Sequence, residues 1–169
     1  MRAQLGDGRV VTIRPIRPSD FDTLRTFFAA LSRETLRLRF HSMTNELPDH
    51  LLRAFTLANH HAHVAIVAEV HDSAAGRDPE LIAEARFVRS ADSESAEFAL
   101  VVADNWRRVG LGTLLTRILS QRARFTGIRR LCGDILDDNK AMKGLARSLG
   151  AGLSRTFGRA GTFRLSLNV

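Results

Sequence analysis

The chain has 169 residues, a 44% hydrophobic fraction and a formal net charge of +7. These values argue against a disordered chain and predict a single globular domain over residues 1–169. The positive charge favours an anionic partner without choosing among nucleic acid, membrane, acidic protein and phosphate-bearing cofactor. The basic residues form no long run, which disfavours nucleic acid.

Cysteine content and hydropathy narrow the class further. Cys132 is the only cysteine, so an intramolecular disulfide is excluded and a reducing compartment is the simpler expectation. Residues 1–8 lack the apolar core of a signal peptide, and no apolar run approaches the ~18 residues of a membrane helix. We therefore expect a cytoplasmic protein without a membrane partner.

The first half of the chain mixes short strands with helices. Alternating or continuous apolar runs predict strands, and a 3.6-residue apolar spacing predicts helices. The expected elements are a strand at 10–16, helices at 20–31, 33–40 and 48–57, and a buried strand at 64–68. Ser19 with Asp22 matches a capping box at the start of the first helix.

The second half predicts more strands and two longer helices. Strands are expected at 81–88, 96–102 and 130–135, turns at 72–80 and 90–95, and a closing hairpin at 153–157 and 162–167. A helix is expected from Leu111 until Gly127 closes it, and a second one at Asn139–Leu149, where Gly150 follows as the stop. The strands at 81–88 and 96–102 form an antiparallel hairpin in this interpretation. The predicted fold class is a mixed sheet with helices on its faces, α/β or α+β.

The most informative stretch runs from Arg107 to Gly112, as a glycine-containing loop between a strand and a helix. The first amides of a helix have no intrahelical partners and lie at the positive end of its dipole. Glycine lets the backbone approach a phosphate closely, so the loop predicts a phosphate or pyrophosphate site with Arg107 and Arg108 beside it. From the glycine spacing alone, a plain turn into a helix is an equal alternative. A Walker loop is excluded, because no Gly-Lys-Ser/Thr is present.

Arg107-x-x-Gly110-x-Gly112 resembles the (Gln/Arg)-x-x-Gly-x-(Gly/Ala) signature of the GNAT superfamily of acyl-CoA N-acyltransferases. The order of elements on both sides of the loop is also similar, so the resemblance covers nearly the whole chain. Residues 14–20, 31–40 and 96–102 are similar to a narrower branch. This branch is the acetyltransferase domain of Pat-type bacterial protein lysine acetyltransferases.

The resemblance implies a mostly antiparallel central sheet with helices on both faces, acetyl-CoA as co-substrate, no metal, and an amine acceptor. It places the cofactor on the strand before the loop, on the loop itself and at the start of the second helix. The implied binding residues are Leu100, Val101, Val102, Arg107, Arg108, Val109, Gly110, Leu111, Gly112, Thr113 and Asn139.

Glu97 is the candidate general base. Its neighbours in the predicted strand are apolar, and a carboxylate in apolar surroundings accepts a proton more readily near neutral pH. In Pat-like proteins, a Glu at this place is thought to deprotonate the acceptor amine. A carboxylate at a strand edge, pointing to solvent, is the alternative for Glu97, and Glu84 on the preceding strand is the rival base.

One departure from the family concerns the general acid. Many GNAT enzymes carry a Tyr on the second helix where this chain has Ala146, and the chain contains no Tyr. A phenolic acid is therefore excluded, and the CoA thiolate would leave unprotonated or take a proton from water. Cys132 is a weaker candidate for this role, because a cysteine in the core is the favoured interpretation.

Two further features carry less weight. Adjacent histidines rarely converge on one ion, so we expect a solvated or substrate-contacting loop at His60, His61 and His63 rather than a metal site. Trp106 either covers the apolar base of the glycine loop, which we favour, or contacts a ligand.

The sequence therefore predicts acetyl transfer from acetyl-CoA to a primary amine by direct attack, with a protein lysine ε-amine as the favoured acceptor. A small amine such as a polyamine, an amino acid or an antibiotic is the first alternative. A non-catalytic acyl-CoA-binding regulatory module is the second. Nucleic acid is not expected as a partner, and a homo-oligomer is left open.

Overall fold

The computed structural model describes residues 1–44, 46–71, 78–92, 94–156 and 160–169. Within these residues, the chain forms one eight-stranded sheet in the order β1-β2-β3-β4-β5-β6-β8-β7. Neighbouring strands are antiparallel except for β5 and β6, which run parallel, so the expected mixed sheet is confirmed. The strands are β1 (Arg2–Gln4), β2 (Val10–Pro15), β3 (His63–Val70), β4 (Glu80–Arg89), β5 (Ser95–Val102), β6 (Arg130–Leu136), β7 (Gly152–Arg155) and β8 (Thr162–Asn168).

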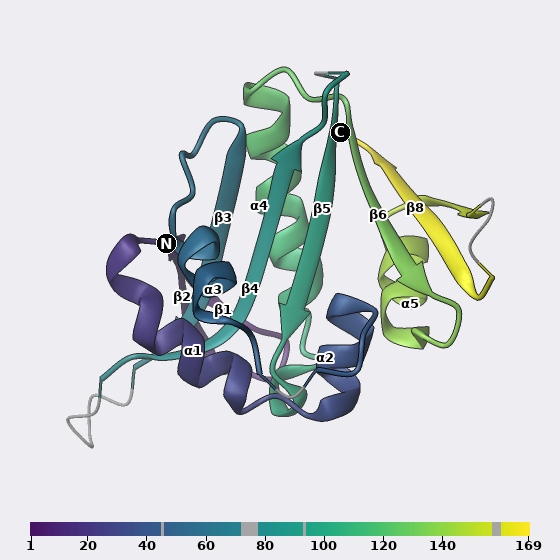
Figure 1. Ribbon diagram of the computed structural model, residues 1–169. Helices are drawn as coiled ribbons and strands as arrows, with labels where there is room; N and C mark the ends of the chain where they lie inside the picture. The colour runs from purple at the N-terminus through teal and green to yellow at the C-terminus, as the bar shows by residue number, and fades with distance from the viewer. Residues whose placement is uncertain (45, 72–77, 93, 157–159) are drawn as a thin grey trace.

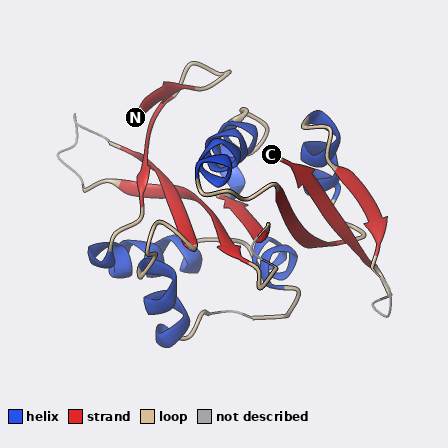
Figure 2. Cartoon of the chain, turned by 90° about the horizontal axis from the view of Figure 1, so that it is seen from above, coloured by secondary structure: helices blue, strands red, loops and turns tan. Residues whose placement is uncertain are grey.

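Helices cover both faces of this sheet (Figure 1). The three helices of the first half, α1 (Phe21–Ala29), α2 (Arg33–Phe40) and α3 (Asp49–Thr56), lie on one face. The other face carries α4 (Leu111–Phe125) and α5 (Lys140–Ser148). Figure 2 shows the two layers of helices from above, with the twisted sheet between them.

Each face of the sheet has its own apolar core. On α4, Leu111, Leu115 and Leu119 recur at helical spacing and are at most 1% exposed. On the opposite face, Leu24 and Phe28 of α1 are buried against the sheet. Successive side chains of a strand point to opposite faces, which explains why a strand covered on both sides, such as β3, is apolar almost throughout.

The strands β5 and β6 stay together for three residue pairs only, ending at Glu97 and Cys132. At this point, a Cβ on Gly133 would lie 2.7 Å from the carbonyl oxygen of Phe98, so the close approach requires glycine. Both strands continue beyond the last pair, β5 to Val102 and β6 to Leu136. They separate there, and the resulting gap positions the candidate site.

The structure corrects the predicted N-terminal region. The short strand β1, paired with β2, was not predicted, because three residues are too few to show a period. The capping box of Ser19 and Asp22 is wrong, since α1 begins at Phe21 after a 3₁₀ turn. Asp20 organises this turn instead. Its carboxylate accepts a hydrogen bond from the Arg17 N–H at 2.7 Å and forms an ion pair with Arg14. Because this ion pair is shielded from solvent, it stabilises the turn more than a hydrogen bond to a serine cap would.

Other predicted boundaries hold within a few residues. The hairpin of β4 and β5 and the closing hairpin of β7 and β8 are confirmed as antiparallel. Most of the turn predicted at 72–80, and the end of the strand predicted at 153–157, lie outside the described residues. In the described part of the chain, no helix is both long and apolar enough to cross a membrane.

Candidate active site

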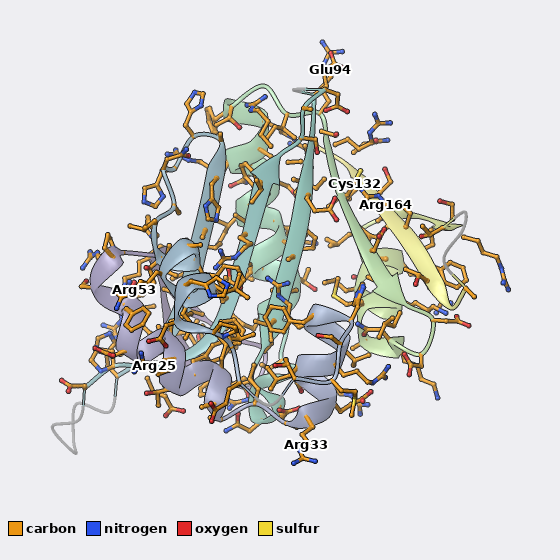
Figure 3. The ribbon with its side chains drawn as sticks, in the orientation of Figure 1. Arg25, Arg33, Arg53, Glu94, Cys132 and Arg164 are labelled. Carbon is orange, nitrogen blue, oxygen red and sulfur yellow. The ribbon has the colours of Figure 1, made fainter. Side chains whose placement is uncertain are left out.

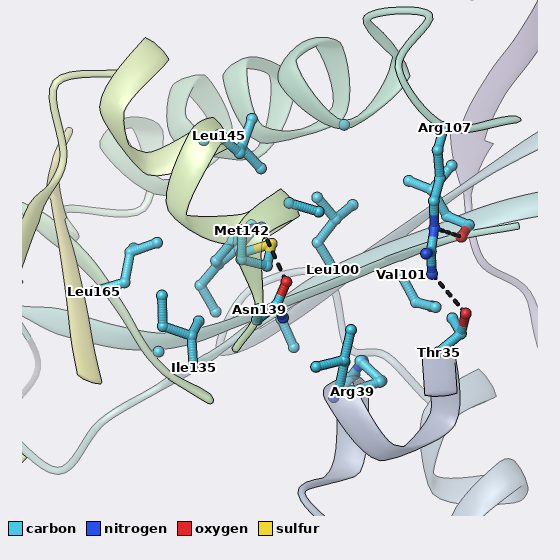
Figure 4. A pocket seen from close by; sticks show the side chains of 18 of the residues that line it. Thr35, Arg39, Leu100, Val101, Arg107, Ile135, Asn139, Met142, Leu145 and Leu165 are labelled. Carbon is cyan, nitrogen blue, oxygen red and sulfur yellow. Dashed lines mark hydrogen bonds between the residues drawn. The ribbon is translucent and has the colours of Figure 1, made fainter. Parts of the chain in front are cut away.

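A cleft of about 760 Å³ lies where β5 and β6 separate (Figure 4). Residues of α2 line one side, and the start of α4 together with α5 lines the other. Most residues expected to bind the cofactor line it, namely Leu100, Val101, Val102, Arg107, Arg108, Gly110, Gly112, Thr113 and Asn139. Val109 and Leu111 pack in the apolar core instead, so only their backbone groups are available to a ligand.

The loop before α4 has the backbone conformation of an anion site. Arg108 and Gly110 have positive φ angles of 61° and 88°, and Gly110 is the N-cap of α4. The N–H of Leu114 donates to the carbonyl of Gly110, so the amides of residues 111–113 have no acceptor within the helix. The first turn, described in full, holds no acidic residue. A phosphate group fits this positive helix end.

Arg107 connects the loop to α2. Its guanidinium donates to Thr35 Oγ1 at 2.6 Å and lies 3.3 Å from the Asp104 carboxylate. Asp104 also accepts the Thr35 hydroxyl at 2.7 Å and the N–H of Ser32, the N-cap of α2. Burial raises the pKa of Asp104, but the hydrogen bonds from Thr35 and Ser32 and the nearby Arg107 outweigh it and lower that pKa overall. The Arg107 side chain thus has protein partners, and contact with a phosphate stays a prediction.

The free edge of β5 presents backbone groups to the cleft. The N–H of Ala103 donates towards β4, and backbone groups alternate along a strand, so those of Leu100 and Val102 face the gap. The Phe98 carbonyl oxygen, which lies against β6, has the same orientation. An extended ligand in the gap can therefore pair with Leu100 and with the N–H of Val102, whose carbonyl oxygen accepts from Arg107 Nε at 3.4 Å. The backbone of Val101 faces β4 instead, which leaves its side chain as a cleft contact.

The α5 wall gives the cleft an apolar lining. Asn139 is 4% exposed and caps α5, with its Oδ1 accepting the Met142 N–H at 3.0 Å. Met142, Leu145 and Ile135 line the space beside it (Figure 4). Ala146, at the position of the missing Tyr, is fully buried in the core beneath this wall.

Glu97 lines the cleft at the last residue pair of β5 and β6. Its side chain is half exposed, and its two carboxylate oxygens accept from Arg164 at 3.1 and 2.8 Å. The expected apolar surroundings are therefore wrong. Alternation turns Phe98 to the opposite face, and the described helices leave the face of β6 and β8 next to Glu97 open (Figure 1).

The rival carboxylate belongs to a separate buried cluster. Glu84 is fully buried, accepts from Arg86 Nε at 2.5 Å and lies 3.6 Å from Arg39. Arg86 also contacts Nε2 of His63 at 3.2 Å. Burial lowers the pKa of Arg39 and, together with the charge of Arg86, that of His63. Glu84 does not line the cleft, whereas Glu97 does.

The remaining candidates are placed as follows. Among the described residues, no group of three or more His, Cys, Asp or Glu side chains is arranged to hold a metal ion. Cys132 is buried next to Glu97 in the register, with its Sγ 3.9 Å from Ser166 Oγ. Trp106 packs against the core and also lines the cleft, and the guanidinium of Arg9 lies 3.7 Å from its ring centre.

Three polar residues of the site were not predicted from the sequence. Thr35 is 72 residues from Arg107, and Arg164 is 67 residues from Glu97. Asp134, which contacts Arg164, comes from a third strand. Only the packing of α2 and the strand order β5-β6-β8 bring these residues together, and no local pattern in the sequence marks them.

The fold and the cleft suit an extended ligand with a phosphate group, bound where two strands of a mixed sheet separate. Comparisons with known proteins identify the class of protein. The family model described as the acetyltransferase (GNAT) domain matches residues 11–152. The chain is 32% identical over 146 residues to an acetyltransferase of Pseudomonas aeruginosa, over 86% of this chain and 77% of the relative. The chain belongs to the GNAT family of acetyltransferases, and acetyl-CoA is its acyl donor.

Further similarities agree with the Pat-like branch. The chain is 32% identical over 152 residues to the acetyltransferase Pat of Mycolicibacterium smegmatis, over 88% of this chain but 43% of that protein. The crystal structure of the GNAT domain of S. lividans PAT superposes with a TM-score of 0.91 at 26% identity, covering 100% and 96% of the two chains. The structure of a cAMP-binding acyltransferase from Mycobacterium smegmatis superposes with a TM-score of 0.68 at 25% identity, covering 100% of this chain and 46% of that one. This chain thus covers less than half the length of each of these mycobacterial matches.

Proposed function

We propose that the protein transfers the acetyl group of acetyl-CoA to a protein lysine ε-amine, with Glu97 as the general base. The place of Glu97 carries the proposal, because its carboxylate lies where β5 and β6 separate, in the same cleft as the anion-binding loop. The similarity to Pat supports a lysine acceptor. The open face of β6 and β8 beside Glu97 also leaves room for a side chain that projects from a protein surface.

Different residues of the cleft bind the donor and accept the proton. The amides of residues 111–113 bind the phosphate end of the donor, and the backbone of Leu100 and Val102 pairs with its extended arm. Acetyl-CoA supplies a thioester carbonyl that an amine can attack. Glu97 accepts a proton from the acceptor ammonium, whose free pKa is ~10.4, so that the nitrogen lone pair becomes available. The leaving thiolate receives no proton from a phenol, because the chain has no Tyr.

The acceptor is tested by measuring the release of free CoA. Acetyl-CoA is incubated with the protein and a panel of lysine-containing proteins and peptides, a polyamine, free amino acids and an aminoglycoside. We expect release with the lysine side chains, and mass spectrometry should locate the acetyl group on Nζ. Release with the small amines alone would replace the lysine acceptor by a small-molecule one. Binding of acetyl-CoA without any release would contradict an enzymatic role and favour a regulatory module.

The base is tested with Glu97→Gln. We expect kcat to fall by about 100-fold or more, because general-base catalysis contributes roughly 10²–10⁴-fold. The dissociation constant of acetyl-CoA should not change, since the anion-binding loop is untouched. Glu94→Gln, at an exposed site before β5, is the matched control and should retain full activity (Figure 3). A full rate in Glu97→Gln would show that another group is the base.

A further inference from the structure

One guanidinium connects the two sides of the gap between β5 and β6. Arg164 lies on β8, opposite Asp134 of β6 in the register, and reaches across β6 to Glu97 on β5. Figure 3 shows Arg164 over the part of the sheet formed by β6 and β8. Its NH2 group donates to Oε2 of Glu97 at 2.8 Å, and its NH1 group donates to Oε1 of Glu97 at 3.1 Å and to Oδ1 of Asp134 at 3.0 Å.

The ion pairs of Arg164 with Glu97 and Asp134 add little to the stability of the fold. The side chains of Arg164, Glu97 and Asp134 are 37%, 50% and 19% exposed, and ion pairs with this much solvent contact contribute little to the free energy of unfolding. The geometry is nevertheless specific. A two-pronged contact between guanidinium and carboxylate fixes the plane of the carboxylate as well as its position.

The position of Glu97 at the end of the β5–β6 pairing explains why its side chain needs such a contact. Glu97 belongs to the last residue pair that β5 shares with β6, so ladder hydrogen bonds support the strand on one side only beyond this point. Arg164 compensates by linking Glu97 to β6 and β8, and Asp134 accepts from the same NH1 group that contacts Glu97. Each carboxylate oxygen carries two lone pairs, and Arg164 occupies one on each. Glu97 can therefore accept an N–H of the acceptor while it stays bound to Arg164.

We propose that Arg164 is a positioning residue for acetyl transfer, which holds the carboxylate of Glu97 in the orientation that receives the acceptor's proton. Asp134 orients Arg164 in turn. The inference rests on the proposed role of Glu97 as the base. It assigns to β8 a part in the reaction, although Arg164 need not touch the acceptor.

The first test compares Arg164→Met with the wild type, using Nα-acetyl-lysine N-methylamide as a probe that offers one ε-amine. We expect kcat to fall by roughly 10- to 100-fold, as for a misplaced catalytic group, while the dissociation constant of acetyl-CoA stays within about twofold. Arg164→Lys keeps the charge but loses the two-pronged contact, so it should recover only part of the rate. Arg155→Met is the matched control, because this arginine of the neighbouring β7 lies over Phe163 and should not affect the rate.

The second test is a double variant, which separates action through Glu97 from an independent role. If Arg164 acts through Glu97, Glu97→Gln combined with Arg164→Met should be no slower than Glu97→Gln alone. A double variant slowed by the product of the two single effects would overturn the positioning role. The positioning role would also be overturned if Arg164→Met kept the full rate while Glu97→Gln was slow. A full rate in Glu97→Gln, or no turnover of the probe by the wild type, would instead contradict the proposed function and remove the basis of the inference.

Thermal unfolding of each variant separates positioning from loss of structure. If Arg164→Met lowers the Tm by more than a few degrees, Asp134→Asn takes its place, because it leaves the contact between Arg164 and Glu97 intact. We expect Asp134→Asn to lower kcat by a smaller factor with unchanged binding of acetyl-CoA. An unchanged kcat in a folded Asp134→Asn variant would contradict the proposed orientation of Arg164.

Discussion

Asp104 joins two parts of the site that are far apart in the sequence. Its carboxylate accepts from Ser32 and Thr35 of the α2 region and lies beside Arg107 of the loop before α4. Loop and helix therefore share one acceptor. An uncharged amide at this position would keep one acceptor oxygen and lose both the second oxygen and the charge.

We expect Asp104→Asn to weaken the binding of acetyl-CoA by about tenfold, in line with the ~1.5 kcal/mol of a hydrogen bond to a charged group. With one uncharged acceptor oxygen left, this side chain could no longer hold both Arg107 and the N-terminus of α2, so the loop would lose its fixed position. Isothermal titration calorimetry measures the effect. Asp49→Asn, at an exposed carboxylate paired with Arg25, is the control and should bind normally. Normal binding by Asp104→Asn would show that the loop keeps its conformation without this carboxylate.

At the scale of residues, the sequence revealed the parts of the site that are continuous in the chain. The loop from Arg107 to Gly112 could be predicted because its amides, glycines and arginines are neighbours. The surroundings of Glu97 could not, because its neighbours in the strand point to the other face. What contacts Glu97 depends on β8, which follows 67 residues later.

At the scale of elements, the cluster around Glu84 holds α2 and α3 against β4. Glu84 is the carboxylate next to two guanidinium groups, those of Arg86 on its own strand and Arg39 on α2. The Arg86 guanidinium also stacks on the ring of Phe55 from α3, 3.7 Å from the ring centre. A buried charge without its partner is costly, so this contact between helices and sheet depends on Glu84.

We expect Glu84→Gln to destabilise the protein by roughly 3–5 kcal/mol, the usual cost of removing one partner from a buried ionic group. Urea unfolding followed by circular dichroism gives the free energy. Glu80→Gln, at the exposed start of the same strand, should change it by less than about 0.5 kcal/mol. A loss below ~1 kcal/mol in Glu84→Gln would mean that the two arginines find other partners.

Helices with a regular apolar stripe were predicted well, and the elements organised by distant contacts were not. The stripe of α4 and the glycine after it define that helix from the sequence alone, and Gly127 has the positive φ of 79° expected at a helix end. The start of α1 was predicted within one residue, but its cap was wrong, because Asp20 pairs with Arg14 of β2 and Ser19 does not cap the helix. Local signals fail where a shielded ion pair competes with them.

At the scale of the whole molecule, composition predicted one globular domain, and the apolar patterns predicted the elements of a mixed sheet with helices on its faces. The resemblance added that the sheet is mostly antiparallel. Spacing alone does not reveal that β8 inserts between β6 and β7, or that β5 and β6 separate after three pairs. These two features create the cleft and the contact between Arg164 and Glu97. The cytoplasmic location and the oligomeric state stay predictions.

The stability of the whole molecule should depend on pH through His63. Burial lowers the pKa of His63 below its ordinary value of 6.5. The positive charge of Arg86 lowers it further, against the opposing effect of Glu84. The Arg86 guanidinium donates to Nε2, which must then be an unprotonated ring nitrogen. The unfolded chain takes up a proton near pH 6.5, whereas the folded protein does so only at lower pH. Between these values, the unfolded state binds more protons, so the free energy of unfolding falls as the pH falls.

We therefore expect urea unfolding between about pH 7.5 and about pH 5 to show a declining free energy, with the decline beginning near pH 6.5. His63→Gln should flatten the decline, because an amide can accept from Arg86 and does not titrate in this range. His50→Gln, on the exposed side of α3, is the matched control and should keep the slope of the wild type. A full slope in His63→Gln would assign the pH dependence to another group. A flat wild-type profile would show that His63 takes up its proton equally in the folded and unfolded states.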